Sequence, residues 1–111
     1  MRWFVVLLLL VFVGECLGAI TVEKYQKAPN DGRFKIYIAG VGEGVSFVNV
    51  RLKMRGQPPL YCEPEDSALG PDDYLRILNS ELKQPDIASL GPDMTVEVLM
   101  IRGLERTFPC P

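Results

Sequence analysis

The sequence contains no histidine among its 111 residues. Histidine is the commonest general base, the usual partner of a nucleophilic serine or cysteine, and the commonest zinc ligand. Its absence removes the main routes to hydrolytic and metal-assisted catalysis. We therefore expect a protein that is not an enzyme, with no catalytic residue, no metal and no cofactor.

An excess of charge of one sign is also lacking. The 12 lysines and arginines nearly balance the 14 aspartates and glutamates, which leaves a net charge of −2. Nucleic acids and acidic membrane surfaces attract strongly basic patches, so this composition favours neither as a partner. The acidic run Glu63, Glu65 and Asp66 is suited to a cation, but such runs are more often solvated loops.

A nucleotide-binding loop is missing as well. The stretch Gly40-Val41-Gly42-Glu43-Gly44 has neither the GxGxxG spacing nor a following lysine and serine or threonine. We interpret these glycines as positions at which another part of the backbone approaches closely, because glycine has no Cβ.

Only the N-terminus has a long apolar run. Arg2 precedes an unbroken apolar stretch from Trp3 to Val13, and small residues follow as far as Ala19. This is the pattern of a secretory signal peptide. The run would rise about 16 Å as a helix, against about 30 Å of bilayer hydrocarbon, so we expect no membrane anchor. We expect residues 1–19 to be removed and residues 20–111 to form a single small domain.

Cysteine is scarce, with three residues in the chain. Removal of the signal peptide discards Cys16, and a lipid anchor at Cys16 is disfavoured by Glu15 just before it. The remaining Cys62 and Cys110 form an even pair behind an export signal, which predicts a disulfide in an oxidising compartment. The alternative is two free, buried thiols.

Two segments near the C-terminus have the pattern of amphipathic helices, residues 71–83 and 92–107. Each begins at a Leu-Gly-Pro-Asp sequence, which suits a helix start because proline needs no partner for an N–H there and aspartate meets the positive end of the helix. The loop 84–91 between them is short. We therefore expect the two helices to pack antiparallel as a helical hairpin.

Residues 33–54 fit two patterns. Phe34, Ile36 and Ile38 alternate as in a strand, and the glycines that follow could turn a β-hairpin. An apolar stripe that begins at Phe34, Ile38 and Val41 has helical spacing. Because each glycine costs about 1 kcal/mol in a helix, local propensity slightly favours the hairpin. The preceding residues 20–32 are polar and suit a short strand, a loop or a frayed helix.

Four short motifs resemble one protein family in order and spacing. They are Tyr37-Ile38-Ala39-Gly40, Leu60-Tyr61-Cys62-Glu63-Pro64, Tyr74-Leu75 and Phe108-Pro109-Cys110. Together they resemble the Rap/Tai immunity proteins of bacterial type VI secretion, over about residues 33–110. These small exported proteins protect a cell against peptidoglycan amidase effectors that its neighbours deliver.

The resemblance implies a mainly α fold, a small bundle of about four helices in which residues 33–54 are helical. It also implies a homodimer in the periplasm that binds and inhibits an exported peptidoglycan amidase effector without catalysis. The inhibitory loop corresponds to residues 84–91, where Asp86 and Ser89 are the polar candidates for partner binding. The alternative is a periplasmic chaperone-like or structural helper on the same scaffold.

Overall fold

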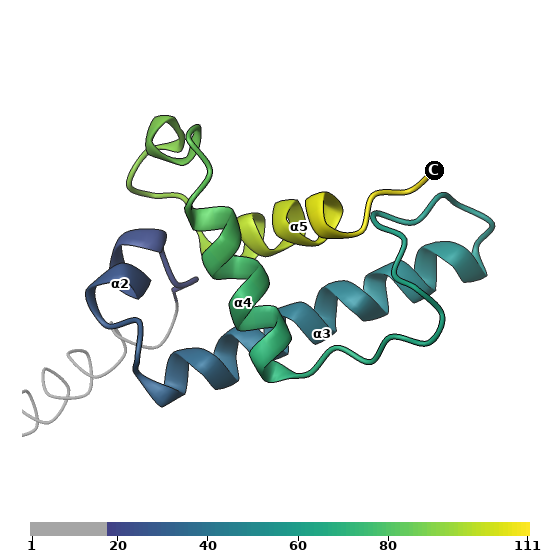
Figure 1. Ribbon diagram of the computed structural model, residues 1–111, viewed down its shortest axis with the longest axis horizontal. Coiled ribbons are helices and arrows are strands. Elements are labelled where there is room, and N and C mark those ends of the chain that lie inside the picture. Colours follow the sequence, from purple (N-terminus) through teal and green to yellow (C-terminus); the bar gives the residue numbers. More distant parts are fainter. Residues whose placement is uncertain (1–17) are drawn as a thin grey trace, which may run out of the picture.

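The protein is mainly α-helical in the computed structural model (Figure 1), which describes residues 18–111. Residues 1–17, and with them most of the predicted signal peptide, lie outside the described residues. The described part contains α2 (Val22–Lys27), α3 (Gly32–Met54), α4 (Pro71–Leu82), the 3₁₀ helix η2 (Ile87–Leu90) and α5 (Val96–Thr107). The prediction of a small helical bundle is confirmed.

Residues 33–54 form one continuous helix, so the β-hairpin that local propensity favoured is wrong. Asp31 caps its N-terminus, because the carboxylate accepts a hydrogen bond of 2.9 Å from the backbone N–H of Arg33. The helix packs against both α4 and α5 and buries Ile38 and Asn49 on that side. This packing outweighs the helix-breaking tendency of the glycines, which is a local and weaker effect.

Helix α4 forms where the sequence predicts it, and ends one residue earlier. Pro71 occupies the first helical turn, and the carboxylate of Asp73 accepts a hydrogen bond of 2.8 Å from the backbone N–H of Gly70. Its inward side buries Tyr74 and Leu78. The proline and the acidic first turn therefore start this helix as expected.

Helix α5 begins at Val96, about one turn later than predicted, so the second Leu-Gly-Pro-Asp sequence starts no helix. The residues before α5 pair instead with the N-terminal stretch. Val22 N–H donates to the carbonyl of Met94 at 2.8 Å, and Val96 N–H donates to the carbonyl of Ile20 at 2.9 Å. This pairing forms the isolated bridge between Thr21 and Thr95 and holds the chain extended.

Helix α4 runs across α3 and α5 rather than alongside them, as Figure 1 shows. The prediction of an antiparallel hairpin of α4 and α5 is therefore wrong. A Cβ atom on Gly42 of α3 would lie 2.2 Å from the ring of Tyr74, and one on Gly103 of α5 would lie 2.8 Å from Cγ2 of Ile77. Helices that approach so closely at one glycine favour a crossing over side-by-side packing.

The predicted disulfide between Cys62 and Cys110 is present, with an S–S distance of 2.08 Å and a sequence separation of 48. Backbone N–H of Cys62 also donates to the carbonyl of Phe108 at 2.8 Å. In the chain-entropy model a cross-link over so long a loop contributes about 4 kcal/mol to the free energy of unfolding. The bond ties the end of the chain to the segment that follows α3.

The buried Asn49 of α3 holds the same segment from the other side. Its side-chain amide donates to the carbonyl of Tyr61 at 2.7 Å, and its side-chain oxygen accepts from the N–H of Leu60 at 2.6 Å. Tyr61 is itself buried and lies against Phe108, with the ring centroids 6.2 Å apart. One polar side chain thus fixes an irregular segment that has no helical hydrogen bonds of its own.

Candidate functional site

The loop of residues 84–91 links the end of α4 to the stretch before α5 and contains η2. Figure 1 shows it standing out beyond the end of α4, away from α3. Pro85, Asp86, Ala88 and Ser89 are exposed in it. The tip of the loop is therefore open to solvent.

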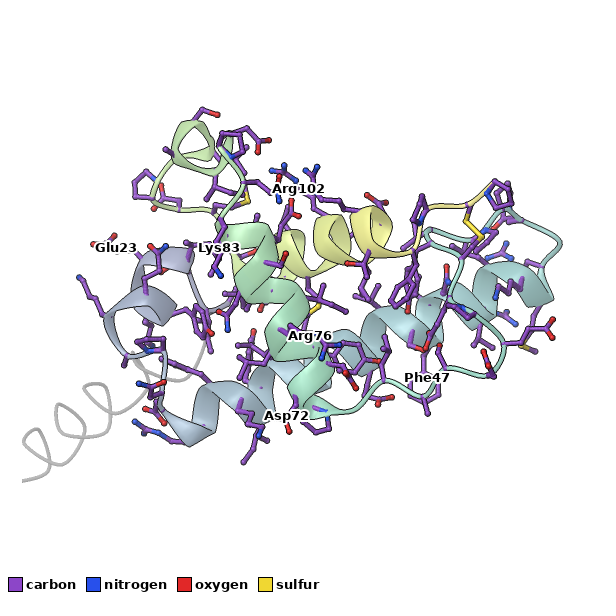
Figure 2. The ribbon with its side chains drawn as sticks, viewed as in Figure 1. Glu23, Phe47, Asp72, Arg76, Lys83 and Arg102 are labelled. Carbon is purple, nitrogen blue, oxygen red and sulfur yellow. A yellow bond between two sulfur atoms is a disulfide. The ribbon has the colours of Figure 1, made fainter. Side chains whose placement is uncertain are left out.

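The base of this loop rests on an ion network around the buried Glu81. Glu81, at the end of α4, is only 1% exposed and accepts a hydrogen bond of 2.9 Å from Nε of Arg106. Nε of Arg102 lies 3.3 Å from the same carboxylate, and the other end of the Arg102 guanidinium donates to Asp86 at 2.6 Å. Figure 2 shows Arg102 between the loop and α5. The network therefore fixes the loop to α5.

The ion pairs of this network favour the charged forms of its members. The hydrogen bond from Arg102 lowers the pKa of Asp86 below its ordinary value, and the hydrogen bond to Glu81 raises the pKa of Arg106. A buried carboxylate is costly unless it is paired and hydrogen-bonded. Glu81 meets that requirement through two arginines from the neighbouring helix, which explains how it stays in the interior.

The structure brings together the two residues that were predicted to bind a partner. The hydroxyl of Ser89 donates to the carbonyl of Asp86 at 2.6 Å, and the backbone N–H of Ser89 donates to the same carbonyl at 3.1 Å. Asp86 also precedes the first residue of η2 and pairs with Arg102. Both side chains therefore shape the loop, while Pro85 and Ala88 are exposed at its surface.

Glu81, Arg102 and Arg106 were not among the predicted site residues. Arg102 and Arg106 lie four positions apart in α5, which places them on one side of the helix. That spacing was available in the sequence. What the sequence did not reveal is the crossing of α4 over α5, and only this crossing brings Glu81 between the two arginines.

A cavity of about 470 Å³ separates the 84–91 loop from α2. Val22, Glu23 and Gln26 line it from α2, and Ile87 and Ala88 line it from the loop. The loop is thus supported by α5 on one side and borders a hollow on the other.

Among residues 18–111, no group of three or more histidine, cysteine, aspartate or glutamate side chains is placed to hold a metal ion. None of the helices in the same range combines the length and the apolar character that crossing a bilayer requires. In the acidic run, the hydroxyl of Ser67 donates to Glu63 at 2.6 Å, and Glu65 and Asp66 are exposed.

A second surface lies on α3, on the side that faces solvent. Ile36 is 77% exposed, Phe47 69% and Met54 73%. Figure 2 shows Phe47 on the side of α3 that is turned away from α5. We call the solvent-facing residues 36, 40, 43, 44, 47, 50, 51 and 54 the outer face of α3. Three large apolar side chains are thus exposed along this face, with glycines and charged residues between them.

Comparison with models of known protein families, with curated proteins and with solved structures found no match for this chain.

Proposed function

We propose that the protein is an exported, non-catalytic immunity protein that binds a peptidoglycan amidase effector and blocks its active-site cleft with the 84–91 loop. The observation that carries this proposal is the bracing of an exposed loop by the buried Glu81 and its two arginines. The target class comes from the resemblance of the cysteine and aromatic motifs to the Rap/Tai proteins. The Cys62–Cys110 disulfide is compatible with the oxidising periplasm.

A braced loop suits inhibition because ordering costs oppose binding. A loop that is already fixed in its bound shape loses little conformational entropy when it enters a cleft. In this loop, the ion pair between Asp86 and Arg102 and the hydrogen bond from Ser89 provide that order. A few anchoring residues at the tip then supply most of the binding energy. Pro85 and Ala88 are exposed where such anchors are needed.

The test is affinity capture of the exported protein from the periplasm, followed by an assay of the captured enzyme on purified peptidoglycan. We expect one stoichiometric partner whose cleavage of peptidoglycan stops when the protein is present. Ala88→Arg places a bulky charge on the loop and should weaken inhibition by at least about tenfold. Ala68→Arg is the matched control, since Ala68 is also exposed but lies in the connection before α4.

Two results would contradict the proposal. A captured enzyme that cleaves peptidoglycan equally well with and without the protein would show that binding is not inhibition. Equal losses of inhibition in Ala88→Arg and Ala68→Arg would show that the loop is not the inhibitory element.

The second candidate is a chaperone-like helper, and the outer face of α3 favours it. Exposed Ile36, Phe47 and Met54 offer an apolar surface to unfolded chains. A helper binds many clients weakly and suppresses the light scattering of a heat-aggregating enzyme such as citrate synthase. If the protein suppresses this scattering and captures no stoichiometric partner, the helper function replaces the inhibitor.

A further inference from the structure

A further cavity, of about 350 Å³, lies between α3 and the connection from α3 to α4. Figure 1 shows this connection returning along α3 to the start of α4. The cavity shares no lining residue with the hollow beside the 84–91 loop, so it is a separate candidate site. Its charged lining residues are Glu43, Lys53, Glu63 and Glu65, and Ser46 and Tyr74 add hydroxyl groups.

The lining of this cavity has an excess of negative charge. Glu43, Glu63 and Glu65 contribute three carboxylates. Lys53 is the one cation among the lining residues that the structure describes, so the excess is two negative charges. No salt bridge within residues 18–111 includes any of these four side chains. A ligand that balances the lining therefore has two positive charges.

Two buried tyrosine hydroxyls lie beside this lining. Tyr74 is only 2% exposed and lines the cavity. Burial first, and then Glu43, Tyr61 and Glu63, raise its pKa to about 12, and no hydrogen bond within the described chain lowers it. The hydroxyl of Tyr61, a residue that is 1% exposed, has no hydrogen-bond partner among residues 18–111. Burial raises the pKa of this hydroxyl as well, and Ser46, Glu63 and Glu43 also influence it, which places it near the cavity.

These unpaired groups specify the chemistry of a ligand. A carboxylate only accepts hydrogen bonds, and a tyrosine hydroxyl can also accept one. A primary ammonium group donates hydrogen bonds and accepts none, so it complements both. The volume of about 350 Å³ far exceeds that of a single metal ion and has room for a short aliphatic chain.

We propose that this cavity binds a small aliphatic diamine, a short hydrocarbon chain with an ammonium group at each end. The carboxylates of Glu43, Glu63 and Glu65 accept hydrogen bonds from the two ammonium groups, and the Tyr74 hydroxyl accepts another. The two positive charges of the ligand balance the excess charge of the lining. The ring of Tyr74 is held closely against Gly42, so its hydroxyl is in position before the ligand binds.

Other ligands fit this lining less well. The three carboxylates repel an anion, and an uncharged sugar leaves their charge unbalanced. A lysine side chain of a partner protein brings one ammonium group and leaves one negative charge. The diamine is the ligand that matches both the charge and the hydrogen-bonding groups.

Isothermal titration calorimetry of the purified protein with putrescine, at low ionic strength, tests the inference. We expect one binding site per chain. Butylamine keeps one ammonium group and should bind about tenfold more weakly, and butanediol, which has none, should not bind. Added salt should weaken the binding of putrescine, because ions screen the charges of an open cavity.

Substitutions in the lining test the assigned contacts. Glu43→Gln and Glu63→Gln should each raise the dissociation constant for putrescine by about tenfold, because each removes one carboxylate charge. Tyr74→Phe keeps the ring that contacts Gly42 and should raise the constant by about threefold, because one acceptor is lost. Glu105→Gln is the matched control, since Glu105 is an exposed residue of α5 that does not line the cavity.

The inference does not depend on the proposed function, and two variants separate them. Ala68 lines this cavity, so Ala68→Arg places a guanidinium group where the ligand binds. This variant should lose the binding of putrescine and keep inhibition of the amidase. Ala88→Arg should weaken inhibition and leave the binding of putrescine unchanged, because Ala88 lies on the 84–91 loop.

Three results would overturn the inference. The first is an absence of binding at millimolar putrescine by both calorimetry and equilibrium dialysis. The second is equal affinity for putrescine and butanediol. The third is an unchanged dissociation constant for putrescine in both Glu43→Gln and Glu63→Gln.

Discussion

Helices α3 and α5 differ in how they dispose of their apolar residues. Helix α5 buries Val96, Leu99, Met100 and Leu104 on one side and carries Glu105 and Arg106 on another. Helix α3 is nearly twice as long, yet of its 23 residues only Ile38, Gly42 and Asn49 are buried. A surface helix normally has one apolar stripe. Helix α5 therefore buries one apolar stripe and leaves Val98 exposed, whereas α3 leaves Ile36, Phe47 and Met54 exposed.

The glycines show the same difference at the level of single atoms. Gly42 and Gly103 lie where α4 crosses α3 and α5, and a Cβ atom at either position would come within 3 Å of a side chain of α4. Gly40 and Gly44 have open space around them. Glycines of one helix therefore lie in two environments, one at a close helix crossing and the other in open space.

The largest expected effect concerns the interior contact between α4 and α5. Glu81→Ala removes a buried side chain together with its hydrogen bonds with Arg106 and its ion pair with Arg102, and should lower the free energy of unfolding by about 2 to 3 kcal/mol. Urea denaturation followed by circular dichroism measures this value. Glu105→Ala, an exposed position on α5, is the control and should change it by less than about 0.5 kcal/mol. Equal free energies of unfolding for Glu81→Ala and Glu105→Ala would show that the ion network around Glu81 does not stabilise the fold.

Sequence patterns predicted the parts of the fold that local chemistry determines. Pro71 and the acidic residues after it mark the start of α4, and the pairing of Cys62 with Cys110 follows from the cysteine count. The Leu-Gly-Pro-Asp sequence around Pro92 does not start a helix. The hydrogen bonds of Val22 and Val96 with residues distant in sequence decide where α5 begins. Local signals are reliable only where no distant segment competes with them.

The sequence nominated the 84–91 loop as the candidate site, but it did not predict the contacts that hold this loop. The resemblance indicated the 84–91 loop and nominated Asp86 and Ser89, which do contact each other. It gave no indication of Glu81, whose burial depends on how α4 crosses α5. Crossing geometry arises from the shapes of two helix surfaces in contact, and a one-dimensional pattern does not contain it.

A smaller effect should separate the two kinds of glycine in α3. Gly42→Ala drives a Cβ atom into the ring of Tyr74 and should lower the free energy of unfolding by about 1 to 3 kcal/mol. Gly44→Ala adds a Cβ atom in open space and should raise it by about 0.5 to 1 kcal/mol. Urea denaturation followed by circular dichroism measures the free energy of unfolding of both variants. A loss of stability in both Gly42→Ala and Gly44→Ala would show that the two positions do not differ in the space they leave for a Cβ atom.

The smallest effect at neutral pH is expected at Tyr74, which lies under Gly42 at the crossing of α3 and α4. Burial raises the pKa of Tyr74 from 10.0 to about 12. Below pH 10 the hydroxyl is protonated in both the folded and the unfolded chain, so the shift contributes nothing to stability there. Between pH 10 and 12 the unfolded chain loses this proton while the folded chain keeps it. The free energy of unfolding therefore falls as the pH rises through this range.

Tyr74→Phe tests this pH dependence without changing the ring that contacts Gly42. At pH 7 the variant should match the wild type within about 0.5 kcal/mol, because only the hydroxyl is removed. Between pH 10 and 12 its free energy of unfolding should fall less steeply than that of the wild type. The remaining slope is expected from Tyr25 and Tyr61, whose pKa values burial also raises. Identical slopes would show that the Tyr74 hydroxyl is solvated at the crossing, so that α3 and α4 are less tightly packed there than Gly42 requires.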